Sequence, residues 1–454
     1  MAQARDMTKG NIFLHIILYA VPMILGNYLQ LTYNMADSII IGKFLGEDSL
    51  AAVSTVSPIM TLMVLGASGI GMGASIIIAR LFGAEDYPRM KREFSTTVIA
   101  GTIFSLAVFV IGFLFAKEIL VLIMTPESII SESLTYLRIM FVGFLFTFQY
   151  NIMAHSLRGI GNTLMPVVFL GVSCGMNILL DLLFIAVYDM GSAGAGYATL
   201  ISQFVSVVCC YVYIYTKVDL LKLGKKDFVV DRSLLGETAR LGLITALQQA
   251  AQPVGKLFIQ STINSCGVTV IGAFNAVCRI DDFACIPAQS IGSGIMTCVA
   301  QNRGHKDPLR VRDTMKWGLL ASLCYFPIIF TIVMVFKRPL MVLLTPDGAE
   351  LMITMGVSYL SVKSWVFLLA CIVNANQGYL RGSAKMHMAL LSTILQITIR
   401  ACLVYIWVPE YGIAYEAYAC AIGWIAQTLF GYIYYFLVLR RDCDNIVKAG
   451  GQNR

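Results

Sequence analysis

Residues 157–159 read Leu157-Arg158-Gly159, and about 220 residues later the chain repeats the motif as Leu380-Arg381-Gly382. A second segment repeats at a similar spacing through its glycines, Gly71, Gly73, Gly292 and Gly294. Both copies lie among long apolar runs. A duplicated set of apolar segments is typical of membrane transporters. The repeat predicts an all-α polytopic membrane protein with 12 transmembrane helices in two pseudo-symmetric six-helix lobes.

The composition supports a membrane protein. Hydrophobic residues make up 58% of the 454 residues and charged residues 13%, whereas about 25% are charged in soluble domains. The net charge of +7 is spread over the loops, so nothing favours binding to nucleic acid. Most of the 12 cysteines stand in apolar runs and none forms a CxxC pair, which predicts free thiols rather than disulfides or metal ligands.

Apolar runs long enough to cross about 30 Å of hydrocarbon can be counted along the chain. In the first half they cover residues 12–42, 51–78, 94–116, 136–156, 164–187 and 193–216. In the second half they cover residues 239–265, 269–300, 315–336, 353–378, 387–408 and 413–439. We therefore expect an N-lobe at 1–216, a cytoplasmic linker at 217–238 and a C-lobe at 239–454.

The distribution of basic residues predicts the orientation. Lysines and arginines gather after the second, sixth, eighth and twelfth apolar runs, and the opposite loops carry more acids. Loops rich in lysine and arginine stay on the cytoplasmic side. We expect an integral protein of the plasma (inner) membrane with both termini in the cytoplasm.

Two acids lie inside apolar runs of the first half. Asp37 follows Asn34 by three positions and Asp181 follows Asn177 by four, so each pair shares a helix face. An acid at the centre of a span costs at least about 2.5 kcal/mol, which calls for a compensating role. Carboxyl and amide oxygens can bind Na⁺ or hold a proton, so these four residues are candidates for ion coupling. The alternative is that each aspartate is a hydrogen-bonded structural acid that ties helices together.

The second half carries charges of mixed sign in or near its spans. The candidates for a substrate cavity are Gln248, Gln252, Lys256, Arg279, Lys363 and Arg400. Asp281 and Asp282 stand close enough to Arg279 for a local ion pair. Structural pairing is the favoured interpretation of these charges, and contact with substrate is the alternative, for which Lys256 is the first choice.

Two prolines occupy similar positions in the two halves, Pro22 in the first span and Pro253 in the seventh. A proline inside a helix removes a backbone hydrogen bond and clashes with the preceding turn. We expect both to act as hinges, although a fixed kink would need the same residue.

These features together resemble the multidrug and toxic compound extrusion (MATE) family over nearly the whole chain. The resemblance rests on the segments 22–37, 157–163, 177–181, 196–200 and 380–382. It is closer to the DinF-like branch, and it implies that Asp37, Asn177, Asp181 and Thr199 bind Na⁺ or a proton. One position departs from the pattern, because the family's fourth-helix Asn falls on Ala154, with Asn151 about one turn earlier. The acids of a NorM-like C-lobe site are absent at 251–252 and 370–371.

The resemblance implies a secondary antiporter, not an enzyme, that exports organic and often cationic drugs in exchange for H⁺ or Na⁺ by alternating access. We expect no catalytic residues, no cofactor, no metal beyond Na⁺ at Asp37 and Asp181, a small organic substrate, surrounding lipid and a monomer. The main alternative is a flippase or exporter of a lipid-linked or anionic compound with the same fold. A membrane-embedded prenyltransferase is disfavoured because 281–285 lack a complete DDxxD motif, and a channel is disfavoured by the duplication.

Overall fold

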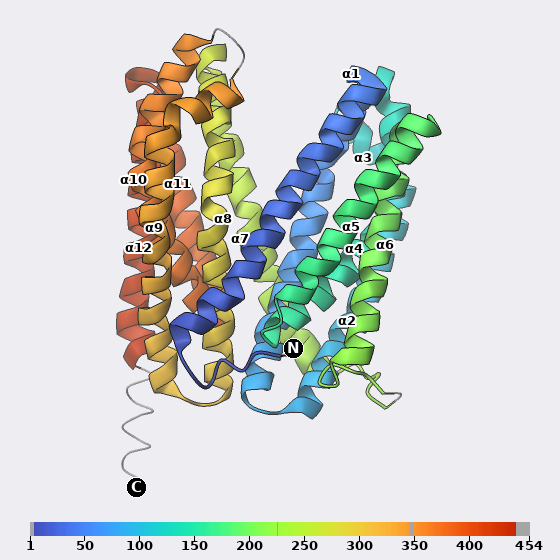
Figure 1. Cartoon of the computed structure of the whole chain (residues 1–454), viewed down its shortest axis with the longest axis vertical. Helices are drawn as coiled ribbons and strands as arrows, with labels where there is room; N and C mark the ends of the chain where they lie inside the picture. Colours follow the sequence, from blue (N-terminus) through green and yellow to red (C-terminus); the bar gives the residue numbers. More distant parts are fainter. Residues whose placement is uncertain (1–3, 225, 346–348, 442–454) are drawn as a thin grey trace. The chain divides into compact units, whose positions relative to one another are not determined.

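The computed structural model describes residues 4–224, 226–345 and 349–441, so the last 13 residues of the expected C-lobe, 442–454, lie outside the described part. The described chain is helical (Figure 1). The helices of the first half are α1 (Ile12–Gly83), α2 (Tyr87–Leu114), α3 (Ala116–Leu122), α4 (Glu127–Gly159), α5 (Leu164–Asp181), a π-helical turn (Leu182–Val187) and α6 (Gly191–Lys217). Those of the second half are α7 (Arg232–Asn264), α8 (Val268–Gly304), α9 (Pro308–Leu344), α10 (Glu350–Gly382), α11 (Met386–Tyr411), α12 (Ala414–Tyr434) and a second π-helical turn (Tyr435–Leu439).

Ten of these helices are long and apolar enough to cross a membrane, with the second π turn counted into α12 and the first into α5. α1 has 72 residues, and its only break in helical backbone angles is at Gly46 (φ 83°, ψ −169°). This left-handed conformation strains residues that carry a Cβ, so glycine permits the break. The predicted spans 12–42 and 51–78 lie on the two sides of Gly46.

The helices extend beyond most of the predicted spans. α9, for example, covers Pro308–Leu344, whereas the apolar run covers only 315–336. Asp307 begins α9 early, because its carboxylate accepts a hydrogen bond from the backbone N–H of Arg310 at 3.0 Å and a proline follows at the first helical position. Helix ends of this kind carry polar residues that an apolar run does not mark.

The chain divides into two compact units. Unit 1 contains residues 1–5 and 25–246, and unit 2 contains residues 6–24 and 247–454. The structure therefore divides the chain at residues that differ from the predicted 216 and 239. α7 begins at Arg232 inside the expected linker, because the Asp231 carboxylate accepts hydrogen bonds from the backbone N–H groups of Ser233 and Leu234 at 2.9 and 3.2 Å.

The sequence repeat has a counterpart in the packing of each unit. α4 and α10 both have 33 residues, and both end in Leu-Arg-Gly. In unit 1 a Cβ at Gly159 would lie 2.9 Å from the Ser75 carbonyl oxygen. In unit 2 a Cβ at Gly382 would overlap Met296. Each terminal glycine therefore permits α4 or α10 to approach the segment that carries the repeated glycines.

Unit 1 includes the first turns of α7, and polar contacts hold them there. The Arg80 guanidinium donates two hydrogen bonds to the Glu237 carboxylate, both at 2.8 Å. The Thr238 hydroxyl donates to the buried Glu93 carboxylate at 2.6 Å. Gly73 allows close packing, since a Cβ there would lie 2.7 Å from the backbone nitrogen of Gly242.

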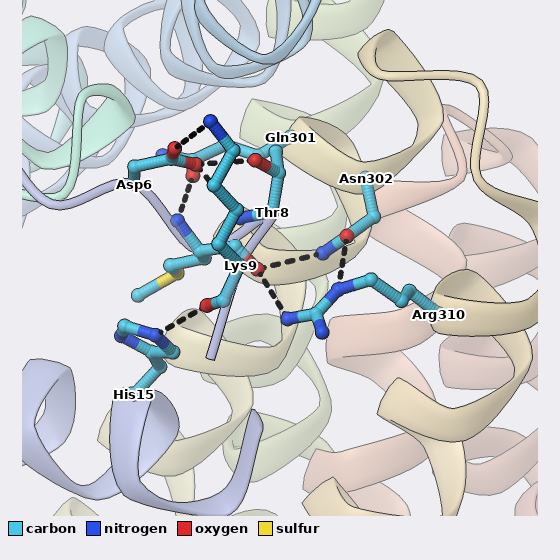
Figure 2. A network of polar contacts seen from close by, with 8 residues as sticks. Asp6, Thr8, Lys9, His15, Gln301, Asn302 and Arg310 are labelled. Carbon is cyan, nitrogen blue, oxygen red and sulfur yellow. Dashed lines mark hydrogen bonds and ion pairs between the residues drawn. The ribbon is translucent and has the colours of Figure 1, made fainter. Parts of the chain in front are cut away.

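Unit 2 includes residues 6–24 in the same manner. Figure 2 shows the anchor, with Gln301, Asn302 and Arg310 beside the start of the chain. The Met7 backbone N–H donates to the Gln301 side chain at 2.9 Å. The Met7 carbonyl accepts from Asn302 at 3.2 Å and from Arg310 at 3.0 Å. Farther along α1, Ile16 and Tyr19 are buried and face Gly294. Each unit therefore contains a segment from the other half of the sequence.

Candidate functional site

Asp37 and Asp181 meet inside unit 1, one from α1 and the other from the last position of α5. Their carboxyl groups lie in hydrogen-bonding contact with each other. The Oδ1 atom of each is buried and accepts no hydrogen bond from the described residues. Two carboxyl oxygens in contact cannot both carry full charge in a low dielectric, so the pair requires a shared proton or a cation.

Asn177 and Thr199 orient this carboxyl pair. With the Asn177 amide nitrogen facing the carboxylate, it donates to Asp181 Oδ2 at 2.8 Å. The amide oxygen then accepts from the Thr199 hydroxyl at 3.3 Å and from its backbone N–H at 3.1 Å. The opposite orientation would place oxygen against oxygen. Asn177 is therefore a donor to Asp181, and α6 holds the amide in place through Thr199.

Two tyrosines and a local change of helix type complete the surroundings. Tyr33, one turn before Asp37 on α1, contacts the Thr199 side chain. Tyr136 of α4 is buried near both aspartates and Tyr33. Directly after Asp181 the helix widens into the π turn Leu182–Val187. π turns inside helices are rare and often lie at functional sites.

Other first-half candidates lie apart from this group. Asn34 is exposed, and its backbone carbonyl accepts a hydrogen bond from the Ser38 hydroxyl at 3.0 Å. Ala154 is buried, and Asn151 donates its amide to the Thr147 carbonyl at 2.8 Å. Among the described contacts, none brings Asn34 or Asn151 to the aspartates.

Unit 2 contains a buried ionic network instead of a carboxyl pair. Lys363 of α10 has a side chain only 1% exposed, and its Nζ lies 3.6 Å from Asp281 Oδ2 of α8. Arg400 of α11 forms an ion pair with Glu416 of α12, which is fully buried. The Tyr359 hydroxyl donates to the same Glu416 carboxylate. These charges tie four helices together.

The six predicted cavity residues separate into two groups. Lys363 and Arg400 belong to the buried network, and Gln248 is buried as well. The Gln248 amide donates to Gln377 at 2.8 Å and to Thr393 at 3.1 Å. By contrast Gln252, Lys256 and Arg279 are exposed.

The expected ion pair between Arg279 and its neighbouring aspartates is not present. Asp281 pairs with Lys363, and Asp282 lies 3.9 Å from Lys256 Nζ. Arg279 has no ion pair in the described part of the chain. The physical reason is competition from neighbouring helices, because Asp281 faces Lys363 of α10 and Asp282, although one turn from Arg279, faces Lys256 of α7.

The prolines expected as hinges both lie inside helices. Pro22 lies within α1, whose backbone angles remain helical apart from Gly46. Pro253 lies inside α7. Their role as hinges stays a prediction.

The sequence analysis did not predict several residues around the carboxyl pair of unit 1 and in the ionic network of unit 2. Glu416 lies near the start of α12, and an acid at the edge of an apolar run is easily taken for a loop residue. Tyr33 and Tyr136 lie in runs where aromatic residues are common. The sequence did contain a signal for Glu416, because this acid lies within the apolar run 413–439 and that run has no basic residue to balance its charge.

The chain matches the family model MatE twice, over residues 22–183 and 245–406. The two matched segments correspond to the two halves of the sequence repeat.

Curated relatives and solved structures agree with that match. The chain is 32% identical over 313 residues to the probable multidrug resistance protein YpnP of Bacillus subtilis, covering 68% of this chain and 69% of the relative. It is 22% identical over 406 residues to the multidrug export protein MepA of Staphylococcus aureus, covering 89% of each. A MOP superfamily transporter from Pyrococcus furiosus has a similar fold, with a TM-score of 0.88 at 21% identity, covering 97% of this chain and 98% of that one.

Proposed function

Since the chain belongs to the MatE family, we propose that it is a secondary antiporter that exports organic compounds in exchange for protons. It is an integral, multi-pass membrane protein whose relatives are transporters rather than enzymes. We propose drug export because YpnP is a probable multidrug resistance protein and MepA is a multidrug export protein. The DinF-like branch is proposed because the carboxyl pair lies in unit 1.

The observation that carries the proposal is the contact between Asp37 and Asp181. A proton shared between two carboxyl groups satisfies this geometry without further ligands. Na⁺ would have to separate the two groups in order to bind oxygen from each. Asn177 supplies a donor to Asp181 rather than an acceptor for a metal ion. We therefore propose H⁺ as the coupling ion, and Na⁺ is the other outcome of the test below.

Coupling follows because the protonated and the deprotonated carboxyl pair favour different separations of Asp37 and Asp181. With one shared proton the carboxyl groups attract each other, and without it they repel. Loss of the proton thus favours a state in which the Asp37 segment of α1 moves away from α5. A ligand shifts such an equilibrium only by its difference in affinity for the two states. Substrate and proton must therefore favour different positions of α1, and exchange results.

The membrane arrangement proposed here has twelve crossings. α1 supplies two of them, on the two sides of Gly46, and α7 supplies one. We place the protein in the plasma (inner) membrane as a monomer with both termini in the cytoplasm, because of the basic loops after α1, α6, α8 and α12.

The test is efflux of a fluorescent organic cation, ethidium, from proteoliposomes under an imposed pH gradient or an imposed Na⁺ gradient. We expect efflux to follow the pH gradient. Asp37→Asn and Asp181→Asn should fold and bind ethidium but lose gradient-driven efflux, because neutral amides hold no exchangeable proton. Asp219→Asn is the matched control, since Asp219 is exposed after α6. Unchanged efflux in both site variants would refute the coupling role. Dependence on Na⁺ alone would replace the proton with Na⁺.

A further inference from the structure

α8 exposes a polar face along its length. Between residues 269 and 302 its exposed positions are Asn275, Arg279, Asp282, Phe283 and Gln289, and only one of these is apolar. Residues 275, 279, 282 and 289 follow helical spacing, so they lie on one face. From 275 to 289 this face extends about 21 Å at 1.5 Å per residue, most of the roughly 30 Å of hydrocarbon.

The exposed positions of a neighbouring helix have the opposite chemistry. Between residues 318 and 336, most exposed side chains of α9 are apolar (Leu320, Ile328, Ile332, Val335 and Phe336) and none is charged. Apolar exposed side chains are what contact with lipid requires, whereas a charged side chain in lipid costs several kcal/mol. The polar face of α8 therefore contacts water rather than lipid, and dissolved compounds can reach it.

The internal repeat allows the α8 face to be compared with the equivalent positions of unit 1. The offset that relates Gly71 to Gly292 places Ser54 at Asn275, Pro58 at Arg279 and Thr61 at Asp282. Ser54, Pro58 and Thr61 are also exposed in unit 1, and none of them is charged. The fold forms this face without charge in unit 1. The charges on the α8 face are therefore not required to form it.

Of the four cations predicted to line a substrate cavity, Lys256, Arg279, Lys363 and Arg400, three have a carboxylate nearby. Asp281 is neutralised by Lys363 at 3.6 Å, and Arg400 by Glu416. Asp282 lies 3.9 Å from Lys256, whose side chain is 48% exposed. Arg279 remains, exposed and without a carboxylate partner in the described part of the chain. An exposed guanidinium binds carboxylates through two parallel hydrogen bonds.

We propose that Arg279 contributes to substrate specificity by binding a carboxylate on the exported compound, and that the protein therefore binds amphipathic organic molecules that carry a carboxylate more tightly than matched molecules that lack one. Lys256 and Asp282 line the same water-exposed side of unit 2. The claim that the bound compound is exported rests on the proposed function. Recognition of a carboxylate by Arg279 can be measured by binding alone.

The experiment compares two dyes that differ by one group. Rhodamine 110 carries a free carboxylate, and rhodamine 123 is its methyl ester. Fluorescence anisotropy gives the Kd of each dye for the purified full-length protein in detergent. We expect the wild type to favour rhodamine 110, and Arg279→Gln to reduce that preference about tenfold, the size expected for loss of a hydrogen-bonded charge pair.

Two further variants make the result specific. Arg279→Lys keeps the charge but not the planar fork, so it should retain part of the preference, and it also supplies the comparison if Arg279→Gln does not fold. Arg338→Gln removes an exposed arginine that pairs with Glu350 and should leave the ratio of the two Kd values unchanged.

Each outcome decides one claim. An unchanged ratio in Arg279→Gln, or a wild type that favours the ester, overturns the assignment of Arg279. If the ratio depends on Arg279 but neither dye is moved by a pH or Na⁺ gradient in proteoliposomes, recognition by Arg279 stands and the proposed antiport fails.

Discussion

Replacing Glu416 tests whether the buried network of unit 2 stabilises the protein. Glu416 is fully buried, forms an ion pair with Arg400 and accepts a hydrogen bond from Tyr359. Glu416→Gln keeps the size of the side chain but leaves the Arg400 guanidinium, itself 16% exposed, without its counter-charge. Removal of one partner from a buried pair costs about 3–5 kcal/mol, because the remaining charge stays desolvated.

The assay is SDS-induced unfolding in mixed micelles, followed by tryptophan fluorescence. Arg338→Gln is the control, since it breaks a pair with Glu350 whose side chains are 65% and 67% exposed. An exposed pair of this kind contributes about 0–1 kcal/mol. We expect the double variant Glu416→Gln, Arg400→Gln to recover part of the loss, because no charge then remains unpaired. A cost for Glu416→Gln no larger than that of the control would refute the reasoning.

Three further predictions concern packing, pH and coupling. Gly378→Ala should destabilise the protein by about 1–3 kcal/mol, because a Cβ there would overlap the Gly292 backbone. Gly236→Ala is the control, since a Cβ there meets open space, and it should stabilise the protein by about 0.5–1 kcal/mol. SDS-induced unfolding measures the stability of both variants. Hydrogen bonds from Arg80 lower the pKa of Glu237, so the carboxylate stabilises the fold above its ordinary pKa, and this contribution disappears as the pH falls through the lowered value. Glu237→Gln should therefore cost about 1 kcal/mol or less at neutral pH and nothing in strong acid, measured by unfolding across pH. Thr199→Val removes one donor to Asn177 and should raise the proton concentration for half-maximal efflux about fivefold; no shift would exclude a role for this hydroxyl.

Apolar periodicity predicted the helices well but not their ends. α9 extends past its apolar run because Asp307 caps it, so that the helix begins at Pro308, seven residues before the predicted start at 315. The break between the first two spans was expected, and Gly46 is the residue that permits it. Side-chain caps and single glycines act locally, so hydrophobicity averaged over a window cannot locate them.

Pairs between helices were harder to predict than residues within one helix. The spacing of Asn177 and Asp181 predicts that they share one face of α5, whereas Thr199 entered the expected set only through the family resemblance. The structure brings both into contact with residues of other helices, Asp181 with Asp37 of α1 and Asn177 with Thr199 of α6. Lys363 was predicted to line the cavity because its partner, Asp281, lies on a helix that is distant in the sequence, so the pair is not visible from either residue alone. A single sequence shows which charges are costly in a membrane, but it does not show which distant residue compensates each of them.

The exchange of residues 6–24 and 232–246 between the two units has a consequence for biosynthesis. Unit 1 cannot close before the start of α7 has left the ribosome, since Glu237 and Thr238 supply partners for Arg80 and Glu93. Unit 2 requires Met7, Ile16 and Tyr19, which are made first and must wait for α8 and α9 to be inserted. Neither half of the gene therefore encodes a self-sufficient folding unit, and expression of either half alone should yield a chain that the cell degrades.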